Sequence, residues 1–526
     1  MRIEVIVLLI YFVLMIGMGV YWNRKAQKSE DFLLGGRQMG PLITALTLQT
    51  TAMSGYMFMG GPSLAYNIGW FAIFYAVGDA GGGIVNISFM ARRMRRLSQL
   101  LNSISPIEYL EKRYDSSKVK VVASIVSIFG LSGYVLAQFL ASGKTLALLF
   151  NFPFAPALIA GVTVILIYTF IGGYFAVAWI DVIQGMIMVT SVIGVLILSI
   201  VKVGGFTALN TKLAEIDPTY LSVWGKGLIY ENGYGVIAGA VLIYLIGYIG
   251  LPHVVIKHMA MEGPATAKKT LLIATIWNQL FIFSPYILGL CGILLLPNIA
   301  DPEMVIPELS FQMFPGVIAA VVLTAIMSAI MSTVAALLLL VGTILSIDLY
   351  KRWLKPDATD KQVVLTSKIA IIMVGIVGIV IAILQPPGIF KLVIFAFGVM
   401  SCALLPSFFC AIWWKKANAT GAVTSMIAGG GINFIWTAMK LEEPTKIHPY
   451  FIGVILSSVC MFVFSHFGKP TAPEMCDLID KAAAKHIFAS AKLEGASSKY
   501  LATEGKAVAN FIKDSAYLEN RGFALA

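Results

Sequence analysis

Residues 49–62 decide the fold, and they read QTTAMSGYMFMGGP. The stretch lies inside an apolar run over residues 40–65, where an uninterrupted membrane helix would be rich in leucine. Its glycines, its proline and its hydroxyl residues break a helix, and a break frees backbone groups that lipid cannot satisfy. Such a break is tolerated at membrane depth where it lines a protein cavity. A second apolar run is interrupted in the same way at residues 247–253, which read GYIGLPH.

The composition places both breaks in a polytopic membrane protein. Of the 526 residues, 58% are hydrophobic and only 12% are charged. A soluble domain carries about 25% charged residues, so a cytosolic enzyme, a disordered chain and a fibrous chain are all excluded. Apolar runs of about 20 residues recur along the sequence, which is the length that a bilayer core about 30 Å thick requires of a helix.

Thirteen membrane helices are predicted, and with them an all-α fold in a cell membrane. Because their number is odd, the two termini are expected on opposite sides. The expected ranges are 4–22, 40–65, 69–91, 120–149, 157–172, 176–203, 235–257, 270–297, 314–348, 367–385, 391–414, 419–439 and 449–467.

The basic residues predict which side each terminus occupies. Most lysines and arginines fall on one side if the loop after the first helix is cytoplasmic, including the run at 92–96 and Lys257, which this count assigns to an inner loop. The positive-inside rule therefore places the N-terminus outside and the C-terminus in the cytoplasm. The net charge of +11 comes from these loops, with no basic stripe interleaved with exposed aromatic residues, so nucleic acid is not an expected partner.

The residues that carry covalent or metal chemistry form no recognisable constellation. The five cysteines are scattered, and the five histidines show no paired-ligand spacing such as HExxH. We therefore do not expect an enzyme.

Two broken helices that lie five spans apart indicate an inverted-repeat transporter with its site at the membrane midplane. The repeats would cover approximately residues 40–203 and 235–414, within a transmembrane transporter domain of residues 1–468. Residues 469–526 are polar and are expected to form a cytoplasmic tail. Ordinary glycine and proline kinks are the alternative explanation of the two breaks.

The ninth span carries a candidate cation site in residues 325–333, which read AIMSAIMST. Ala329, Ser332 and Thr333 are spaced i, i+3 and i+4, so they share one face of the helix. Two hydroxyls and a carbonyl, completed by carbonyls from the break in the second span, would suit a hard monovalent cation. The alternative is that each hydroxyl bonds back to a carbonyl of its own helix.

Three ionisable side chains fall inside predicted spans: Asp79, Lys144 and Asp181. A charge at the centre of a membrane helix costs about 2.5–3.5 kcal/mol on insertion scales, so such a residue is expected to face a cavity or a partner. The alternatives are an interfacial position for Asp181 and a Lys144 side chain that extends outward to water.

Several stretches resemble the solute:sodium symporter family, and most closely its sodium/proline branch. The resemblance covers residues 1–468. It is carried by residues 31–37 with 40–41, 167–173 with 176–184, 247–253, and 329–333 with 348–351. It implies a LeuT-like five-plus-five inverted repeat with extra helices, and sodium-coupled uptake by alternating access.

The resemblance also implies which residues bind the co-transported sodium ion. The family's site corresponds to the backbone carbonyls of Thr50, Met53 and Ala329 and to the hydroxyls of Ser332 and Thr333. Asp181 matches the family's acidic residue that is linked to inward release of sodium.

The substrate cavity of the proline branch matches Tyr134, Tyr244, Tyr248 and Pro252, with Tyr244 standing where that branch has tryptophan. Gln138 lies one turn from Tyr134 and is expected to face the same cavity.

One position departs from the branch. Ala52 stands where the proline branch has an aspartate that is important for sodium. Either Asp79 supplies the missing charge from the next span, or the site works with neutral oxygens alone.

The implied function is sodium-coupled uptake of a small organic solute, with proline or a similar amino acid as the first expectation. Residues 304–309 and 413–419 resemble the pantothenate branch. Pantothenate and short monocarboxylates are therefore alternative substrates. A transporter-like membrane sensor is the alternative from a different class.

Overall fold

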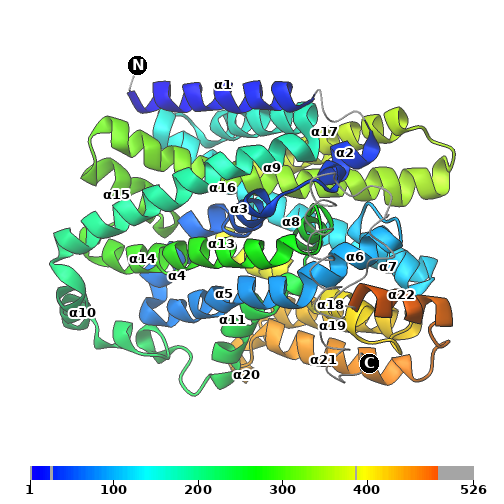
Figure 1. Ribbon diagram of the computed structural model, residues 1–526. Coiled ribbons are helices and arrows are strands. Elements are labelled where there is room, and N and C mark those ends of the chain that lie inside the picture. The colour runs from blue at the N-terminus through cyan, green and yellow to red at the C-terminus, as the bar shows by residue number, and fades with distance from the viewer. Residues whose placement is uncertain (1–2, 24–27, 385–387, 484–526) are drawn as a thin grey trace, which may run out of the picture.

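The computed structural model describes residues 3–23, 28–384 and 388–483. Over these residues the chain is helical and contains no strand. The axes of most of the long helices are roughly aligned with one another, as expected for a bundle that crosses a bilayer (Figure 1). Eight continuous helical segments of the described chain are long and apolar enough to cross a membrane, and two further apolar helices are shorter.

Both predicted helix breaks are present. The second span consists of α3 (Pro41–Ala52), the π-helical turn η2 (Tyr56–Gly60) and α4 (Gly61–Ile68). The seventh span consists of α11 (Tyr234–Leu245), the 3₁₀ turn η7 (Gly247–Gly250) and α12 (Pro252–Met259). Their apolar sequence keeps these segments inside the bundle, while glycine and proline interrupt the hydrogen-bond ladder.

The fifth and sixth spans form one element, α9 (Phe154–Val203), which turns at Gly173. Gly173 has φ 61° and ψ −164°, and a Cβ atom there would lie 2.5 Å from the Phe32 ring. Only glycine adopts this conformation without strain, so the chain turns here, between the expected ranges 157–172 and 176–203.

The other predicted spans are also present, which confirms the thirteen-span fold for the described residues. They are α1 (Ile3–Asn23), α5 (Ile73–Asn86) continued by the π-helical turn η4 (Ile87–Ala91), α8 (Ser117–Phe150), α13 (Thr266–Phe281) followed by α14 (Ser284–Leu295), α16 (Gly316–Thr343) continued by the π-helical segment η9 (Ile344–Leu354), α17 (Asp360–Ile383), α18 (Ile389–Trp413), α19 (Ala419–Ala438) and α21 (Pro449–Ser465).

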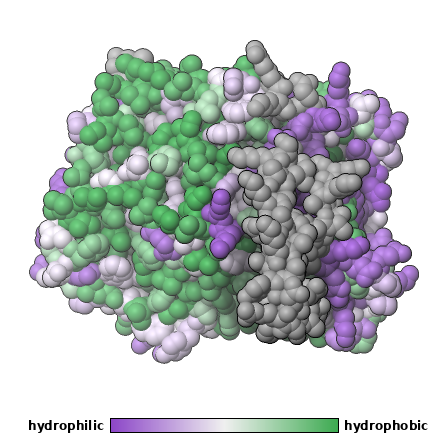
Figure 2. All heavy atoms as spheres, in the orientation of Figure 1, coloured by the Kyte–Doolittle hydropathy of each residue, from purple (hydrophilic) through white to green (hydrophobic). Residues whose placement is uncertain are grey.

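Short helices collect at the two ends of the bundle. One end, which we call the inner end after the predicted topology, carries α2 (Ser29–Leu34), α6 (Arg92–Leu100), α7 (Pro106–Tyr114) and α22 (Pro473–Ala483). The opposite end, the outer end, carries α10 (Gly205–Ile216) and α15 (Val305–Met313), and α20 (Glu442–Thr445) lies at the lower edge of Figure 1. Figure 2 shows hydrophobic residues over the middle and left of one face and hydrophilic residues at its right, where α6, α7 and α22 lie.

Helix α16 lies at the centre of the bundle. Of the most apolar window of Gly316–Leu354, 94% is buried, against 22% for Asp360–Ile383. α16 packs against α1, α3, α8, α9 and α17. Polar side chains on α16 therefore face other helices and not lipid, which is the setting that an internal ion site requires.

Several basic residues that the charge count assigns to inner loops are buried. Lys257 is 2% exposed and lies within α12, so its interpretation as a loop residue was wrong. Arg95 donates to the Met261 carbonyl and Arg113 to the Ala411 carbonyl. These side chains join inner-end segments because buried charges must find partners.

The predicted tail begins after α21, and its described part contains α22, which packs on α6 and α18. Lys415 Nζ lies 2.7 Å from Asp480 Oδ2 on this helix. The rest of the tail, residues 484–526, lies outside the described residues. The domain boundary at residue 468 and the two repeat boundaries stay predictions.

Candidate ion and substrate site

The break in the second span meets α16 at a cluster of buried oxygen atoms. The Ser332 hydroxyl donates to the Thr50 carbonyl at 3.2 Å and lies 3.1 Å from the Ala329 carbonyl. The Thr333 hydroxyl lies 3.2 Å from the Thr51 carbonyl and 3.0 Å from the Ala329 carbonyl. Two hydroxyls and three carbonyls therefore converge at one place, which we call the oxygen cluster.

Hydrogen bonds within α16 explain only part of the arrangement of Ser332 and Thr333. Ser332 and Thr333 do bond to Ala329 in their own helix, but each also reaches the end of α3. Thr50, Ser332 and Thr333 are 0% exposed. Oxygen donors of this kind are the ligands that hard cations take in proteins.

Two residues at the break differ from the sequence-based set. Met53 ends α3 and is buried, and its amide donates to the Gln49 carbonyl, but within the described residues no hydrogen bond joins Met53 to α16. The Thr51 carbonyl does contact α16, and the sequence reasoning did not include it. A carbonyl carries no side-chain signature, so only the backbone geometry could identify it.

Asp181 lies one helical turn of α3 closer to the inner end and forms a buried polar triad. The Thr47 hydroxyl donates to its carboxylate. Lys257 Nζ donates to Thr47 Oγ1 at 2.7 Å and lies 3.8 Å from Asp181 Oδ2. All three side chains are at most 2% exposed. Asp181 is thus an internal residue with its own counter-charge and not an interfacial one.

Asp79 lies on the other side of α3. Its carboxylate accepts a hydrogen bond of 2.8 Å from the Tyr248 hydroxyl, and its backbone carbonyl accepts one of 2.9 Å from Asn278 Nδ2. A cavity of about 20 Å³ adjoins the carboxylate and is also lined by Gln49, Ala52 and other residues of α3, α5 and the seventh span.

The polar part of the expected substrate site surrounds the break itself. The Tyr134 hydroxyl and Gln138 Nε2 both donate to the Ser54 hydroxyl, at 3.0 and 3.3 Å. Gln138 Oε1 accepts from the Gly55 amide at 2.8 Å. The structure therefore brings Tyr134 and Gln138 together, and it adds Ser54, which the sequence reasoning did not include.

The aromatic part lies on the seventh span. The ring centroids of Tyr244 and Tyr248 are 5.9 Å apart, and Tyr244 also lies 5.9 Å from Tyr56 and 5.1 Å from Phe397. Pro252 is buried and begins α12 directly after the extended residue 251. Tyr244 and Tyr248 are thus in ring contact, while Pro252 contributes to the position of the second half-helix.

Lys144 does not extend outward alone. Its ammonium group lies 2.6 Å from Asp301 and 2.5 Å from Glu303 at the outer end. Glu303 also accepts a 2.6 Å hydrogen bond from the Ile389 amide at the start of α18. Lys144 therefore extends to the outer end, where its side chain is 29% exposed, but it meets two carboxylates there and joins α8 to the outer segment that precedes α15.

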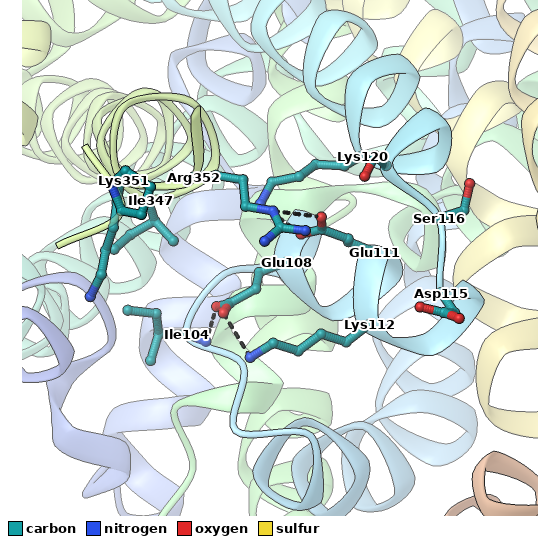
Figure 3. A pocket seen from close by; sticks show the side chains of 12 residues that line it. Ile104, Glu108, Glu111, Lys112, Asp115, Ser116, Lys120, Ile347, Lys351 and Arg352 are labelled. Atoms are coloured by element: carbon teal, nitrogen blue, oxygen red, sulfur yellow. Dashed lines mark hydrogen bonds and ion pairs between the residues drawn. The ribbon is translucent and has the colours of Figure 1, made fainter. Parts of the chain in front are cut away.

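A larger pocket of about 410 Å³ opens at the inner end between α7, α8 and η9 (Figure 3). Arg352 and Lys120 both reach Glu111, at 3.1 and 2.7 Å. Lys120 also lies 3.3 Å from Asp348. Because each buried carboxylate here already has a basic partner, this pocket is an ion-pair network that joins inner segments, and it lies away from the break.

The comparisons with known proteins agree with this geometry. Residues 32–429, more than half of the chain, match the sodium:solute symporter family. The chain belongs to the sodium:solute symporter family. It is therefore a membrane-embedded transporter and not an enzyme, and sodium is its co-transported ion.

Two curated relatives and one solved structure illustrate the similarity. The chain is 28% identical to the osmoregulated proline transporter OpuE of Bacillus subtilis (strain 168) over 90% of this chain and 96% of the relative. It is 28% identical to a sodium/proline symporter of Staphylococcus aureus (strain USA300) over 88% of this chain and 92% of the relative.

The solved structure is the substrate-bound, outward-open state of a Na⁺-coupled sialic acid symporter. The TM-score is 0.73 at 20% identity, over 90% of this chain and 99% of the other. This likeness shows the fold, and it confirms the LeuT-like architecture expected from the sequence.

Proposed function

We propose that this sodium:solute symporter takes up proline or a similar small amino acid. The break at residues 53–55 carries the proposal, because Tyr134 and Gln138 converge there on Ser54 and Gly55 beside the oxygen cluster. The names of the two relatives, a proline transporter and a sodium/proline symporter, support the same substrate.

The break offers a place for a carboxylate. The Gly55 amide lies where a half-helix begins, and half-helix N-termini attract anionic groups. Gln138 Oε1 accepts from this amide now. A substrate carboxylate would replace that oxygen, and the released Gln138 amide group would still reach Ser54 or the substrate.

The aromatic side chains fit the apolar part of such a substrate. Tyr244, Tyr248 and Phe397 present ring faces and edges within 5.1–5.9 Å of one another. Rings of this kind bury a small aliphatic ring well and keep a hydroxyl available for a hydrogen bond.

Sodium bound in the oxygen cluster would couple the transport of the ion to the binding of the substrate. The cluster spans α3 and α16, so an ion bound to Thr50, Thr51, Ala329, Ser332 and Thr333 holds the broken helix against the centre of the bundle. This contact fixes the break to which the substrate binds. By linkage, the substrate then tightens sodium binding by the same factor.

The triad of Asp181, Thr47 and Lys257 lies next along α3 toward the inner end. We place it on the exit path of the ion, as the resemblance implies for Asp181. In the same proposal the N-terminus is outside the cell and the C-terminus is in the cytoplasm, in agreement with the basic inner end.

The ion gradient supplies enough energy for concentrative uptake. One charge that crosses 100 mV releases about 2.3 kcal/mol, and a tenfold sodium gradient adds about 1.4 kcal/mol. Together these support roughly 500-fold accumulation for each sodium ion.

Uptake of labelled L-proline into liposomes that contain the purified protein tests the proposal. An inward sodium gradient is expected to drive accumulation, and an equal choline gradient is not. Ser332→Ala removes one ligand of the oxygen cluster and is expected to raise the half-saturating sodium concentration roughly 5–150-fold, since a buried polar ligand contributes about 1–3 kcal/mol.

Ser328→Ala is the matched control. Ser328 lies one turn earlier on α16, but its hydroxyl bonds to Tyr11 and not to the oxygen cluster. It is expected to keep the sodium dependence of the unmodified protein.

The identity of the substrate has its own outcomes. If proline is not taken up but pantothenate or a short monocarboxylate is, only the substrate assignment changes. If the sodium gradient drives uptake of none of these solutes, the result favours a membrane sensor.

A further inference from the structure

Buried carboxylates in the described chain fall into two groups. Four of the five have a basic partner: Glu111 and Asp348 contact Lys120, Asp181 contacts Lys257, and Glu303 contacts Lys144. Asp79 is the exception. No lysine, arginine or histidine of the described residues lies within ion-pair distance of its carboxylate, and its side-chain partner is the Tyr248 hydroxyl.

The position of Asp79 makes this exception costly. The side chain is 3% exposed and lies in the middle of α5, beside the run Gly81-Gly82-Gly83. An aspartate at the centre of a membrane helix costs about 2.5–3.5 kcal/mol on insertion scales. A single hydroxyl bond does not neutralise a carboxylate, so a bound cation would supply the positive charge that the described residues do not provide.

The cavity beside Asp79 has the size and the lining of a small cation site. Its volume of about 20 Å³ suits a single water molecule or a bare monovalent ion and excludes an amino acid. Its polar lining consists of Asp79, Tyr248, Asn86 and Gln49, and the rest of its wall is apolar or glycine (Leu48, Ala52, Gly83, Ile87 and Val254). Asn86 is 3% exposed, and its Oδ1 atom has no hydrogen-bond partner among the described residues.

This cavity is separate from the oxygen cluster. Gln49 and Ala52 present their side chains to it from α3, whereas Thr50 and Thr51 turn their carbonyls toward α16. The last turn of α3 therefore has a neutral set of oxygens on one side and an anionic set on the other.

We propose that the cavity bounded by Asp79, Asn86 and Tyr248 is a second sodium site. The carboxylate, the free amide oxygen and the hydroxyl supply the oxygen ligands that a hard cation takes. Tyr248 also belongs to the aromatic cluster, so the ion at Asp79 positions a ring that contacts the substrate. The inference rests on the proposed sodium coupling and deepens it to two ions per cycle.

Equilibrium binding of radioactive sodium to the purified, detergent-solubilised protein tests this site without knowledge of the substrate. At a sodium concentration that just saturates the unmodified protein, the unmodified protein is expected to bind two ions, Asp79→Asn close to one, Ser332→Ala close to one, and the double variant close to none. Ser328→Ala is expected to bind two. Asparagine keeps the shape of aspartate, and elution as a single symmetric peak on size exclusion verifies that each variant is folded.

A second variant tests the charge itself. Ala52→Asp in the Asp79→Asn background places a carboxylate on the α3 wall of the same cavity and is expected to restore the second ion. Recovery of the second ion supports the site.

If Asp79→Asn still binds two ions, the second site is wrong. If the unmodified protein binds one ion that only Ser332→Ala removes, the second site is also wrong, while the proposed function stands. If the unmodified protein binds none, the proposed sodium coupling fails and the inference with it.

Discussion

Asp79 and Asp181 are buried aspartates that lie on either side of α3, and they differ in whether a basic side chain accompanies the carboxylate. Asp181 has the ammonium group of Lys257 and the hydroxyl of Thr47, whereas Asp79 has one tyrosine hydroxyl. A carboxylate with a built-in counter-ion is already neutralised and competes weakly for a cation. A carboxylate without a counter-ion stays available, so the pairing of a buried charge indicates how strongly that charge can hold a cation.

The broken seventh span supplies the partners of both aspartates. Its 3₁₀ turn η7 provides Tyr248 to Asp79, and its second half-helix α12 provides Lys257 to Asp181. Pro252 begins the second half. A displacement of one half-helix relative to the other would therefore change the surroundings of both carboxylates together.

The largest expected effect follows from Lys257→Met, which makes Asp181 resemble Asp79. Removal of one partner of a buried ion pair typically destabilises a protein by about 3–5 kcal/mol because the other charge is left uncompensated. We expect a clear fall in the thermal stability of the purified protein, measured from the loss of its size-exclusion peak after heating.

The double variant Lys257→Met with Asp181→Asn is the control for that experiment. It removes both charges and is expected to regain most of the lost stability, although not normal transport. A Lys257→Met protein as stable as the unmodified one would show that the pair carries no net interaction.

A smaller effect is expected for Tyr248→Phe, which removes the hydrogen bond to Asp79 and keeps the ring. A hydrogen bond to a charged group contributes about 1.5–3 kcal/mol, so the affinity for the second sodium ion should fall roughly 10–150-fold. Direct sodium binding measures it. Tyr244→Phe, in the same aromatic cluster but without a bond to Asp79, should leave sodium binding unchanged, and an equal loss in both variants would contradict the assignment.

The smallest effect is expected for Thr47→Val, which keeps the shape of the side chain but removes the hydroxyl between Asp181 and Lys257. A hydrogen bond to a charged group contributes about 1.5–3 kcal/mol, and because the Asp181–Lys257 ion pair itself remains, we expect a loss of stability near the lower end of that range. Thermal stability measured beside Lys257→Met tests this order. A Thr47→Val protein less stable than Lys257→Met would show that the hydroxyl, and not the ammonium group, supports Asp181.

The fold was largely predictable because its signals are local in the sequence. Hydropathy places the spans, glycine and proline mark the breaks at residues 53–55 and 247–251, and Gly173 marks the turn within α9. The face shared by Ser332 and Thr333 also follows from spacing along one helix.

Partners across the bundle were not predictable from the sequence. Lys257 follows a run of apolar residues near the end of a span, so a charge count treats it as a loop residue, and only the packing of α12 on α3 brings it to Asp181. The acidic partners of Lys144 were missed for the same reason, since Asp301 and Glu303 lie in a distant segment of the sequence. The isolation of Asp79 could not be predicted either, because it depends on the absence of a basic side chain from all the described segments that pack around it.

The Lys144 cluster at the outer end has a consequence for how dissolved salt acts on this transporter. Its Lys144 and Asp301 side chains are 29% and 40% exposed, so mobile ions reach them. The Debye length shrinks from about 10 Å at 0.1 M salt to about 3 Å at 1 M. Dissolved salt of any kind, sodium or not, therefore screens this partly exposed cluster more strongly than it screens the Asp181–Lys257 pair inside the bundle.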